Sequence, residues 1–275
     1  MVMELNKIYN MDCSQGLDII EDKFVQCIIT SPPYWGLRDY GDSKHLGAET
    51  TPDEYINNLC DIFSKCKRVL KDDGVLYVNI ADSYFRNGGK AKGTNPKAMV
   101  GNTKRGIQKG NCKVPTGYLE KSLALIPQKF VVEMNKRGWI VRNVIVWHKP
   151  NAMPQPLTDR FGNDFEYIFM FVKQKHYKFN LIKENITGKE RIKRSVWSIN
   201  TKPSKSGHIA PYPTELITPC LLSGSNEGDI VLDPFIGSGT TAQVARINNR
   251  NYIGFEISKE YCNIAEQRTI LSKNK

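Results

Sequence analysis

Residues 228–242 read GDIVLDPFIGSGTTA, and this stretch decides the fold. Its first part is a short apolar run ending at Asp233, which predicts a buried strand, and a helical pattern begins at residue 240. Between them, Gly237 and Gly239 permit a tight turn in which backbone N–H groups can approach a ligand at a helix N-terminus. The stretch therefore predicts the strand–turn–helix unit of a ligand-binding α/β protein. A glycine-rich turn with a purely structural aspartate is the alternative.

Two carboxylates indicate which ligand this turn would bind. Asp233 ends the first strand, and Glu256 ends the next one, NYIGFE, at the separation at which an acid binds a ribose in nucleotide-binding folds. A carboxylate at position 233 would repel a pyrophosphate and attract a cation. A nucleoside with a positively charged tail therefore fits better than a dinucleotide. S-adenosylmethionine (AdoMet) carries both an α-ammonium group and a sulfonium.

The rest of the chain alternates expected strands and helices around this unit. Strands are expected at residues 5–9, 25–30, 74–80, 139–147, 165–173, 229–233 and 251–256, and helices at 52–71, 127–137, 213–223, 240–248 and 258–271. The helix from residue 52 has the clearest signals, because Thr51 is a candidate N-cap and Pro52 suits the first helical position. This alternation predicts a doubly wound, mostly parallel sheet.

Composition narrows the class of partner. Lys and Arg number 39 against 28 Asp and Glu, a formal net charge of +11. A basic surface favours a polyanionic partner, because phosphate binding releases counterions. We expect no membrane partner, since no apolar run approaches the ~20 residues of a spanning helix. The seven cysteines lack a C-x-x-C pair and the four histidines lack ligand spacing, which predicts free thiols, a cytoplasmic protein and no metal site.

Two segments depart from the α/β alternation. Residues 83–119 contain seven Gly, eight Lys or Arg and no acidic residue, and we expect a mobile basic loop there. Residues 173–205 contain ten Lys or Arg and two Glu, with enough aromatic and aliphatic residues to fold as a small appended module. Charge runs are often simply solvated faces. Two such segments on one otherwise balanced core favour nucleic-acid binding.

The stretch TSPPYW at residues 30–35 directly follows the expected strand VQCIIT. Each proline fixes its own φ and lacks an N–H, and each restricts the residue before it. The segment is therefore expected to be rigid and extended, with free carbonyl groups. Taken alone, it indicates only a stiff loop at the exit of a strand.

Together, SPPY at 31–34 and DPFIGSGTT at 233–241 resemble the motifs of the amino-group (N4-cytosine/N6-adenine) DNA methyltransferases. More narrowly, they resemble the permuted class in which the catalytic motif precedes the AdoMet motif. The resemblance covers nearly the whole chain. It implies a circularly permuted, doubly wound, seven-stranded Rossmann-like methyltransferase fold whose last strand is antiparallel. The permuted order requires the strand at 251–256 to lie near the strand at 5–9.

The same resemblance implies a division of the chain and a set of site residues. Residues 1–173 and 206–275 would form the catalytic domain, and 174–205 a small target-recognition segment. The implied catalytic residues are Ser31, Pro32, Pro33 and Tyr34, and the implied AdoMet-binding residues are Asp12, His208, Pro213, Asp233, Phe235, Gly237, Ser238, Gly239, Thr240 and Glu256.

The implied chemistry needs no metal. The Ser31 hydroxyl and the Pro32 carbonyl would accept the hydrogens of an exocyclic amine, which returns the lone pair to nitrogen for in-line attack on the methyl group. Tyr34 would stack on the flipped-out base, with Trp35 as a second wall. Carbon-5 methylation would instead need a thiolate. Cys220 lies in an apolar helical stretch and is expected in the core.

Ser31 favours cytosine N4 as the target, because serine at this position resembles the N4-cytosine members of the family. N6-adenine methylation is the alternative, and a non-catalytic nucleic-acid-binding protein of methyltransferase fold is a more distant one. RNA or protein amide methyltransferases and dinucleotide-dependent oxidoreductases fit the motifs less well. The expected partner is double-stranded DNA, with a cognate restriction endonuclease as a candidate, and both monomer and homodimer stay open.

Overall fold

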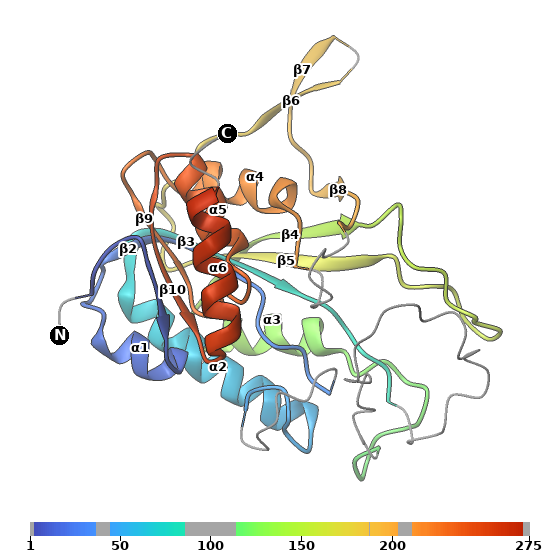
Figure 1. Cartoon of the computed structure of the whole chain (residues 1–275). Helices are drawn as coiled ribbons and strands as arrows, with labels where there is room; N and C mark the ends of the chain where they lie inside the picture. Colours follow the sequence, from blue (N-terminus) through green and yellow to red (C-terminus); the bar gives the residue numbers. More distant parts are fainter. Residues whose placement is uncertain (1–2, 37–44, 86–113, 187, 203–210, 272–275) are drawn as a thin grey trace.

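The computed structural model describes residues 3–36, 45–85, 114–186, 188–202 and 211–271. Within these residues, one sheet of eight strands carries the fold, in the order β1-β10-β9-β2-β3-β5-β4-β8 (Figure 1). Its strands are β1 (Lys7–Asn10), β2 (Val25–Thr30), β3 (Leu70–Ile80), β4 (Ile140–His148), β5 (Phe165–Val172), β8 (Val196–Ser198), β9 (Ile230–Asp233) and β10 (Asn251–Glu256).

All seven expected strands are present, and an eighth, β8, is added at the edge from the segment that was expected to stand apart. The sheet is parallel except at β5, which runs antiparallel to both β3 and β4. The antiparallel strand β5 therefore lies inside the sheet. The expectation that the last strand of the chain is antiparallel is wrong, because β10 is parallel to its neighbours β1 and β9. The mixed, doubly wound sheet is otherwise the expected one.

Helices cover both faces of the sheet. They are α1 (Cys13–Ile19), α2 (Pro52–Val69), α3 (Ile126–Lys136), α4 (Thr214–Gly224), α5 (Thr240–Ile247) and α6 (Lys259–Leu271). The first three pack in one hydrophobic cluster and the last three in the other, so each face has its own core. This two-sided cover explains why the central strands read as continuous apolar runs.

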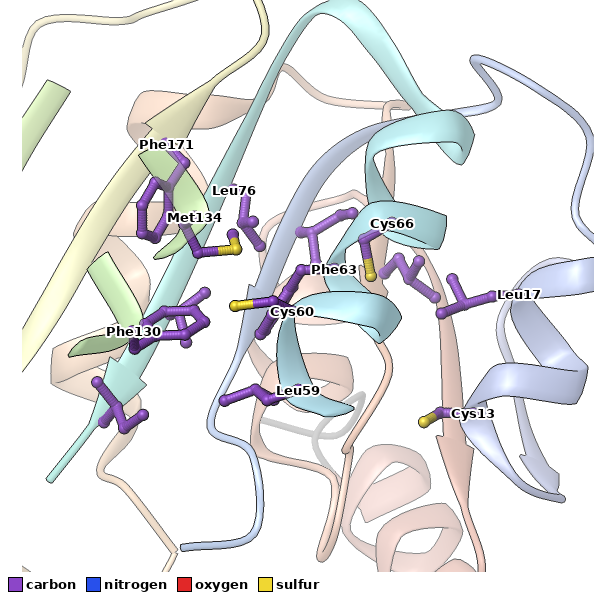
Figure 2. Packing of buried hydrophobic residues seen from close by; sticks show 14 of the residues in the cluster. Cys13, Leu17, Leu59, Cys60, Phe63, Cys66, Leu76, Phe130, Met134 and Phe171 are labelled. Atoms are coloured by element: carbon purple, nitrogen blue, oxygen red, sulfur yellow. The ribbon is translucent and has the colours of Figure 1, made fainter. Parts of the chain in front are cut away.

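The helix α2 begins as its sequence predicts. Thr51 caps it, accepting from the Glu54 amide at 3.2 Å, while the Glu54 carboxylate accepts from the Thr51 amide. Such a reciprocal cap satisfies two backbone donors that the helix leaves unpaired. One face of α2 is buried between the sheet and its neighbours, where Phe63 packs on Phe130 with ring centroids 5.4 Å apart (Figure 2).

The cysteines act as apolar core residues. Six of them, Cys13, Cys27, Cys60, Cys66, Cys220 and Cys262, are free and buried, and Cys112 lies outside the described residues. Burial raises the pKa of the Cys13 and Cys60 thiols to about 12. Figure 2 shows three of these thiols among hydrocarbon side chains. The thiols are therefore neutral and unreactive at physiological pH.

The two distant ends of the sequence meet in the sheet. β1 pairs in parallel with β10, with Ile8 opposite Gly254, and Asn6 donates to Asn251 at 2.9 Å. This is the adjacency that the permuted motif order requires, and it is confirmed. No helix among the described residues is long and apolar enough to span a membrane.

The segment 174–205 is divided between two environments. β6 (Lys183–Ile186) and β7 (Lys189–Ile192) form a separate antiparallel hairpin that projects from the body (Figure 1). The chain on either side of the hairpin is fixed to the body. Before it, the Asn180 amide donates to the carbonyls of Leu222 and Ser225, and after it β8 pairs with β4.

The basic loop expected at 83–119 lies mostly outside the described residues. Its described ends pack together, because the Phe85 and Tyr118 rings lie 4.6 Å apart and the Phe85 amide donates to the Ser122 carbonyl at 2.9 Å.

Candidate active site

The carboxyl ends of four parallel strands meet at one edge of the sheet. Asp12 follows β1, Glu256 ends β10, Asp233 ends β9 and Ser31 follows β2. In open α/β sheets this edge is where ligands bind. The fold therefore brings together the carboxylates and the SPPY motif that the sequence singled out separately.

Asp233 is completely buried, and its carboxylate is fully used inside the protein. One oxygen accepts from the Thr30 hydroxyl at 2.6 Å and the Phe235 amide at 3.0 Å. The other accepts from the hydroxyls of Thr241 at 2.7 Å and Tyr212 at 3.0 Å. Burial raises the pKa of Asp233, although these hydrogen bonds oppose the rise.

This environment corrects the argument that Asp233 attracts a cationic ligand directly. The side chain instead joins the end of β2, the turn after β9 and the start of α5. Thr30, Tyr212 and Thr241 were missed as its partners, because only the tertiary structure brings them together.

The glycine turn is held from behind by a neighbouring helix. Gly239 has φ +84°, and a Cβ there would lie 2.7 Å from the Ala265 Cβ of α6. Arg268, also on α6, donates to the Ser238 carbonyl at 2.9 Å and to its hydroxyl at 2.7 Å. Gly237, at φ +50°, has nothing closer to such a Cβ than the Phe235 carbonyl at 4.0 Å. The turn is thus anchored on the α6 side and open at Gly237.

Glu256 and Asp12 lie on neighbouring strands at the same edge. The Glu256 carboxylate accepts from the Ser258 amide at 2.8 Å, and burial raises its pKa. Asp12 caps α1, accepting from the Ser14 amide at 2.8 Å. The helix α1 was not expected from the sequence, because it has only seven residues.

Four predicted cofactor residues remain, and the structure describes three of them. Phe235 is half-buried in the turn, and Thr240 is buried at the first position of α5. Pro213 is the N-cap residue of α4. His208 lies outside the described residues.

The SPPY segment is fixed by contacts on both sides. Pro32 is buried, and the Pro33 carbonyl accepts from the Tyr55 hydroxyl of α2 at 2.9 Å. The Ser31 hydroxyl donates to the Tyr34 hydroxyl at 3.3 Å. The stiffness expected from the two prolines is therefore reinforced by tertiary contacts.

Trp35 is not a wall of the site. Its side chain is only 4% exposed, its indole N–H donates to the Glu49 carbonyl at 2.9 Å, and its ring packs edge-on against Phe85. The expectation that it stacks on a base is wrong, because the residue belongs to the core.

Three polar residues beside Tyr34 were missed in the sequence. The Tyr34 hydroxyl donates to Glu166 of β5 at 2.8 Å and lies 3.3 Å from the Asn79 oxygen of β3. Glu166 in turn forms an ion pair with Lys149, which directly follows β4. A signal was available, because Glu166 and Asn79 interrupt otherwise apolar strand sequences.

A cavity of about 230 Å³ adjoins these residues, lined by Ala81, Asp82, Leu123, Gln128, Lys149, Asn163, Phe165, Glu166 and Tyr167. Burial raises the pKa of the Asp82 carboxyl. The Oδ2 atom of Asp82 is buried without a hydrogen-bond partner among the described residues. The cavity is thus lined by polar groups from three strand ends, and one of them, Glu166, accepts a hydrogen bond from Tyr34 of the SPPY segment.

The doubly wound sheet with one inserted antiparallel strand and a glycine turn after β9 is a Rossmann-like fold, which the chain shares with solved DNA methyltransferases. Residues 25–267 match the family model described as DNA methylase, the N6/N4 methyltransferases. The chain belongs to this family.

Relatives and solved structures agree with this assignment. The chain is 40% identical over 277 residues to the Type II methyltransferase M.Cfr9I of Citrobacter freundii, covering 97% of this chain and 89% of the relative. Its fold is similar to that of the PvuII DNA methyltransferase (cytosine-N4-specific), with a TM-score of 0.68, 18% identity and coverage of 97% and 90%. It is also similar to TTHA0409 of Thermus thermophilus complexed with S-adenosyl-L-methionine, with a TM-score of 0.64, 22% identity and coverage of 97% and 95%.

Proposed function

We propose that this chain transfers a methyl group from AdoMet to the N4 amino group of cytosine in double-stranded DNA, with the target base rotated out of the helix. The observation that carries the proposal is Ser31. It lies at the sheet edge next to the glycine turn, and it donates its hydrogen to Tyr34. The cytosine-N4 specificity printed for the PvuII enzyme supports the choice of amine.

The residues of the glycine turn fit AdoMet. Gly237 leaves open space at the turn, and Glu256 and Asp12 supply carboxylates on the neighbouring strands. Carboxylates suit ribose hydroxyls and a cationic tail better than they suit a pyrophosphate. Glu256 would bind the ribose, Asp12 the adenine end, and Phe235 would lie against the cofactor. Asp233 would act indirectly, by holding the turn that these groups share.

AdoMet, when bound, supplies a methyl group made electrophilic by its sulfonium. The work of the protein is then orientation. The Ser31 hydroxyl and the Pro32 carbonyl accept the two hydrogens of the amine, and Tyr34 presents its ring to the base. Stacking on an aromatic ring is worth ~1–3 kcal/mol per base, which offsets part of the cost of flipping.

A covalent route through Cys220 does not fit this site. Cys220 is 1% exposed, and burial raises the pKa of its thiol. A neutral buried thiol cannot supply the thiolate that carbon-5 methylation requires.

We further propose that residues 174–205 contact the DNA target and that a restriction endonuclease with the same recognition site is a partner. The Type II designation of M.Cfr9I supports the second proposal. A matching endonuclease would fail to cut DNA that this protein had methylated.

The deciding experiment is transfer of a labelled methyl group from AdoMet to unmethylated double-stranded DNA, followed by nucleoside analysis. N4-methylcytosine is the expected product. N6-methyladenine would replace the proposed target with the alternative amine, and 5-methylcytosine would contradict the mechanism. A complete absence of label in DNA would overturn the proposed function.

A further inference from the structure

We infer that Glu166, acting through Tyr34, orients the hydroxyl of Ser31 so that it can accept a hydrogen bond from the target amine. Glu166 is thus a positioning residue, because it reaches the reacting atoms only through another side chain. The inference rests on the proposed amino methylation and concerns how the site is prepared for it.

Four side chains from three parts of the chain form a continuous line of polar contacts. The Ser31 hydroxyl donates to the Tyr34 hydroxyl at 3.3 Å, and that hydroxyl donates to Oε2 of Glu166 at 2.8 Å. The other oxygen of Glu166 accepts from the Lys149 ammonium. The line therefore runs from the SPPY segment across β5 to the residue after β4.

The direction of each bond in this line follows from donor chemistry. A hydroxyl has one hydrogen and two acceptor sites, a carboxylate only accepts, and an ammonium only donates. Because Glu166 is engaged by Lys149, it presents an acceptor to Tyr34. Tyr34 then gives its hydrogen to Glu166 and accepts the hydrogen of Ser31. In the described parts of the chain no donor bonds to the Ser31 oxygen, so its lone pairs are left for a further donor.

This direction of the hydrogen bonds is what the reaction needs at Ser31. A serine whose hydrogen pointed at the amine would meet the N–H groups donor to donor. A serine whose hydrogen is held by Tyr34 meets them as an acceptor, which favours the geometry in which the nitrogen lone pair is free to attack. The motif supplies the hydroxyl, and Glu166 sets its direction.

Asn79 supports the same polarity. Its amide nitrogen donates to the Tyr167 carbonyl at 3.1 Å, which turns its oxygen toward Tyr34 at 3.3 Å. Within the described part of the chain, Tyr34 therefore faces these two acceptors, of which Glu166 is the nearer.

Partial burial strengthens the anchor at the far end of the line. The side chains of Lys149 and Glu166 are 18% and 12% exposed, and the ammonium also lies 4.5 Å from the centre of the Trp147 ring. Hydrogen bonds between ionised groups are stronger than neutral ones, and more so where water is excluded. Glu166 also lines the 230 Å³ cavity together with Asp82.

The test uses Glu166→Gln, which keeps the shape but replaces the carboxylate acceptor of Tyr34 by an amide donor, so that the Asn79 oxygen at 3.3 Å becomes the remaining acceptor among the described residues. Lys149 can only donate, so it will hold the amide oxygen of the new side chain and leave the amide N–H₂ group facing Tyr34. We expect kcat to fall by about tenfold or more, a loss of about 1.4 kcal/mol in transition-state stabilisation. The KM values for AdoMet and DNA should stay within about twofold, since neither ligand is held by Glu166 in this scheme.

Tyr34→Phe is the second variant, because it keeps the aromatic ring and the Lys149–Glu166 ion pair. It should lower kcat similarly, and the double variant should be no worse than the poorer single one, since Glu166 acts only through Tyr34. Glu133→Gln is the matched control: it removes an ion pair with Arg137 at 3.1 Å on α3, and it should leave kcat unchanged. Thermal unfolding and AdoMet calorimetry on every variant separate loss of the fold from loss of orientation.

Two results would overturn the inference while leaving the proposed function intact. One is wild-type kcat in Glu166→Gln, and the other is a double variant whose losses simply multiply. A wild-type protein that labels neither amine would overturn both proposals together.

Discussion

The hydroxyl of Thr30 donates to Oδ1 of Asp233 at 2.6 Å, although the two residues are 203 positions apart in the chain. Thr30 is the last residue of β2 and Asp233 the last of β9, and these strands are parallel neighbours. The bond therefore joins the two motifs on which the proposed function depends, since SPPY starts one residue after Thr30. It fixes the start of the SPPY segment to the glycine turn.

Asp233→Asn should change how stability depends on pH. Burial raises the pKa of Asp233, so folding favours its protonated form. The stabilisation from this group is complete below the unfolded-state pKa of about 4 and is lost as pH rises through the higher folded-state value. Urea unfolding of both proteins between about pH 4 and pH 8 measures the difference in free energy of unfolding. A difference that is the same at every pH would contradict the raised pKa.

Ser31→Ala should abolish most turnover while AdoMet still binds. Removing one preorganised hydrogen-bonding group aimed at the reacting atoms typically costs about 10²–10³ in kcat. Single-turnover methylation measures the chemical step, and calorimetry with AdoMet measures binding. Loss of cofactor affinity instead would mean that the SPPY segment has a structural role at the turn.

Gly239→Ala should damage both the fold and the proposed cofactor site. The residue has φ +84°, and a Cβ would lie 2.7 Å from the Ala265 Cβ and 2.8 Å from its Cα. We expect a loss of about 1–3 kcal/mol in the free energy of unfolding and weaker AdoMet binding. Gly228→Ala is the control, because it has φ +81° but nothing within 4 Å of a Cβ. Equal effects at both positions would show that backbone conformation alone, and not the contact with α6, is responsible.

The hairpin of β6 and β7 should contribute to DNA affinity through charge. Lys189 and Arg191 are exposed on β7, whereas Lys183 and Lys193 are paired with glutamates of the same hairpin. In the Lys189→Ala/Arg191→Ala double variant, the slope of log K against log salt should shrink by about 0.9 for each phosphate that the protein no longer neutralises. Fluorescence anisotropy with duplex DNA over a salt series measures this. Lys23→Ala, which lies before β2, is the control and should leave the slope unchanged. An unchanged slope in the double variant would show that the hairpin does not contact the DNA.

The sheet could be predicted because its signals are local. The apolar run of residues 25–30 and the capped, periodic helix from Pro52 carry their own evidence, and both appear where expected. Parallel strands also place their carboxyl ends together, so the proximity of Asp12, Asp233 and Glu256 followed from topology. The short elements α1 and β8 were missed, because seven and three residues are too few to show a period.

The roles of the site side chains were harder to predict, since they depend on contacts between distant residues. From the sequence, Trp35 is expected to line the site, but in the fold it bonds to Glu49 and packs against Phe85. From the sequence, Asp233 is expected to face the ligand, but in the fold its oxygens accept hydrogen bonds from Thr30, Tyr212 and Thr241. A sequence shows that a carboxylate ends a strand, but it does not show which donors surround it.

The way β8 is joined to the sheet limits which part of this protein could be exchanged for another. Val196–Ser198 pair with the last three residues of β4, and Asn151 bonds to the backbone of Thr201 just beyond. A hybrid that replaced all of 174–205 would remove β8 and leave β4, next to Lys149, as an edge strand with unpaired backbone groups. Such an edge can pair with other chains and promote aggregation. It would also remove Asn180, which fixes the chain to the end of α4. The transplantable unit is therefore the chain between these two anchors, residues 181–194, and chimeras should be cut there.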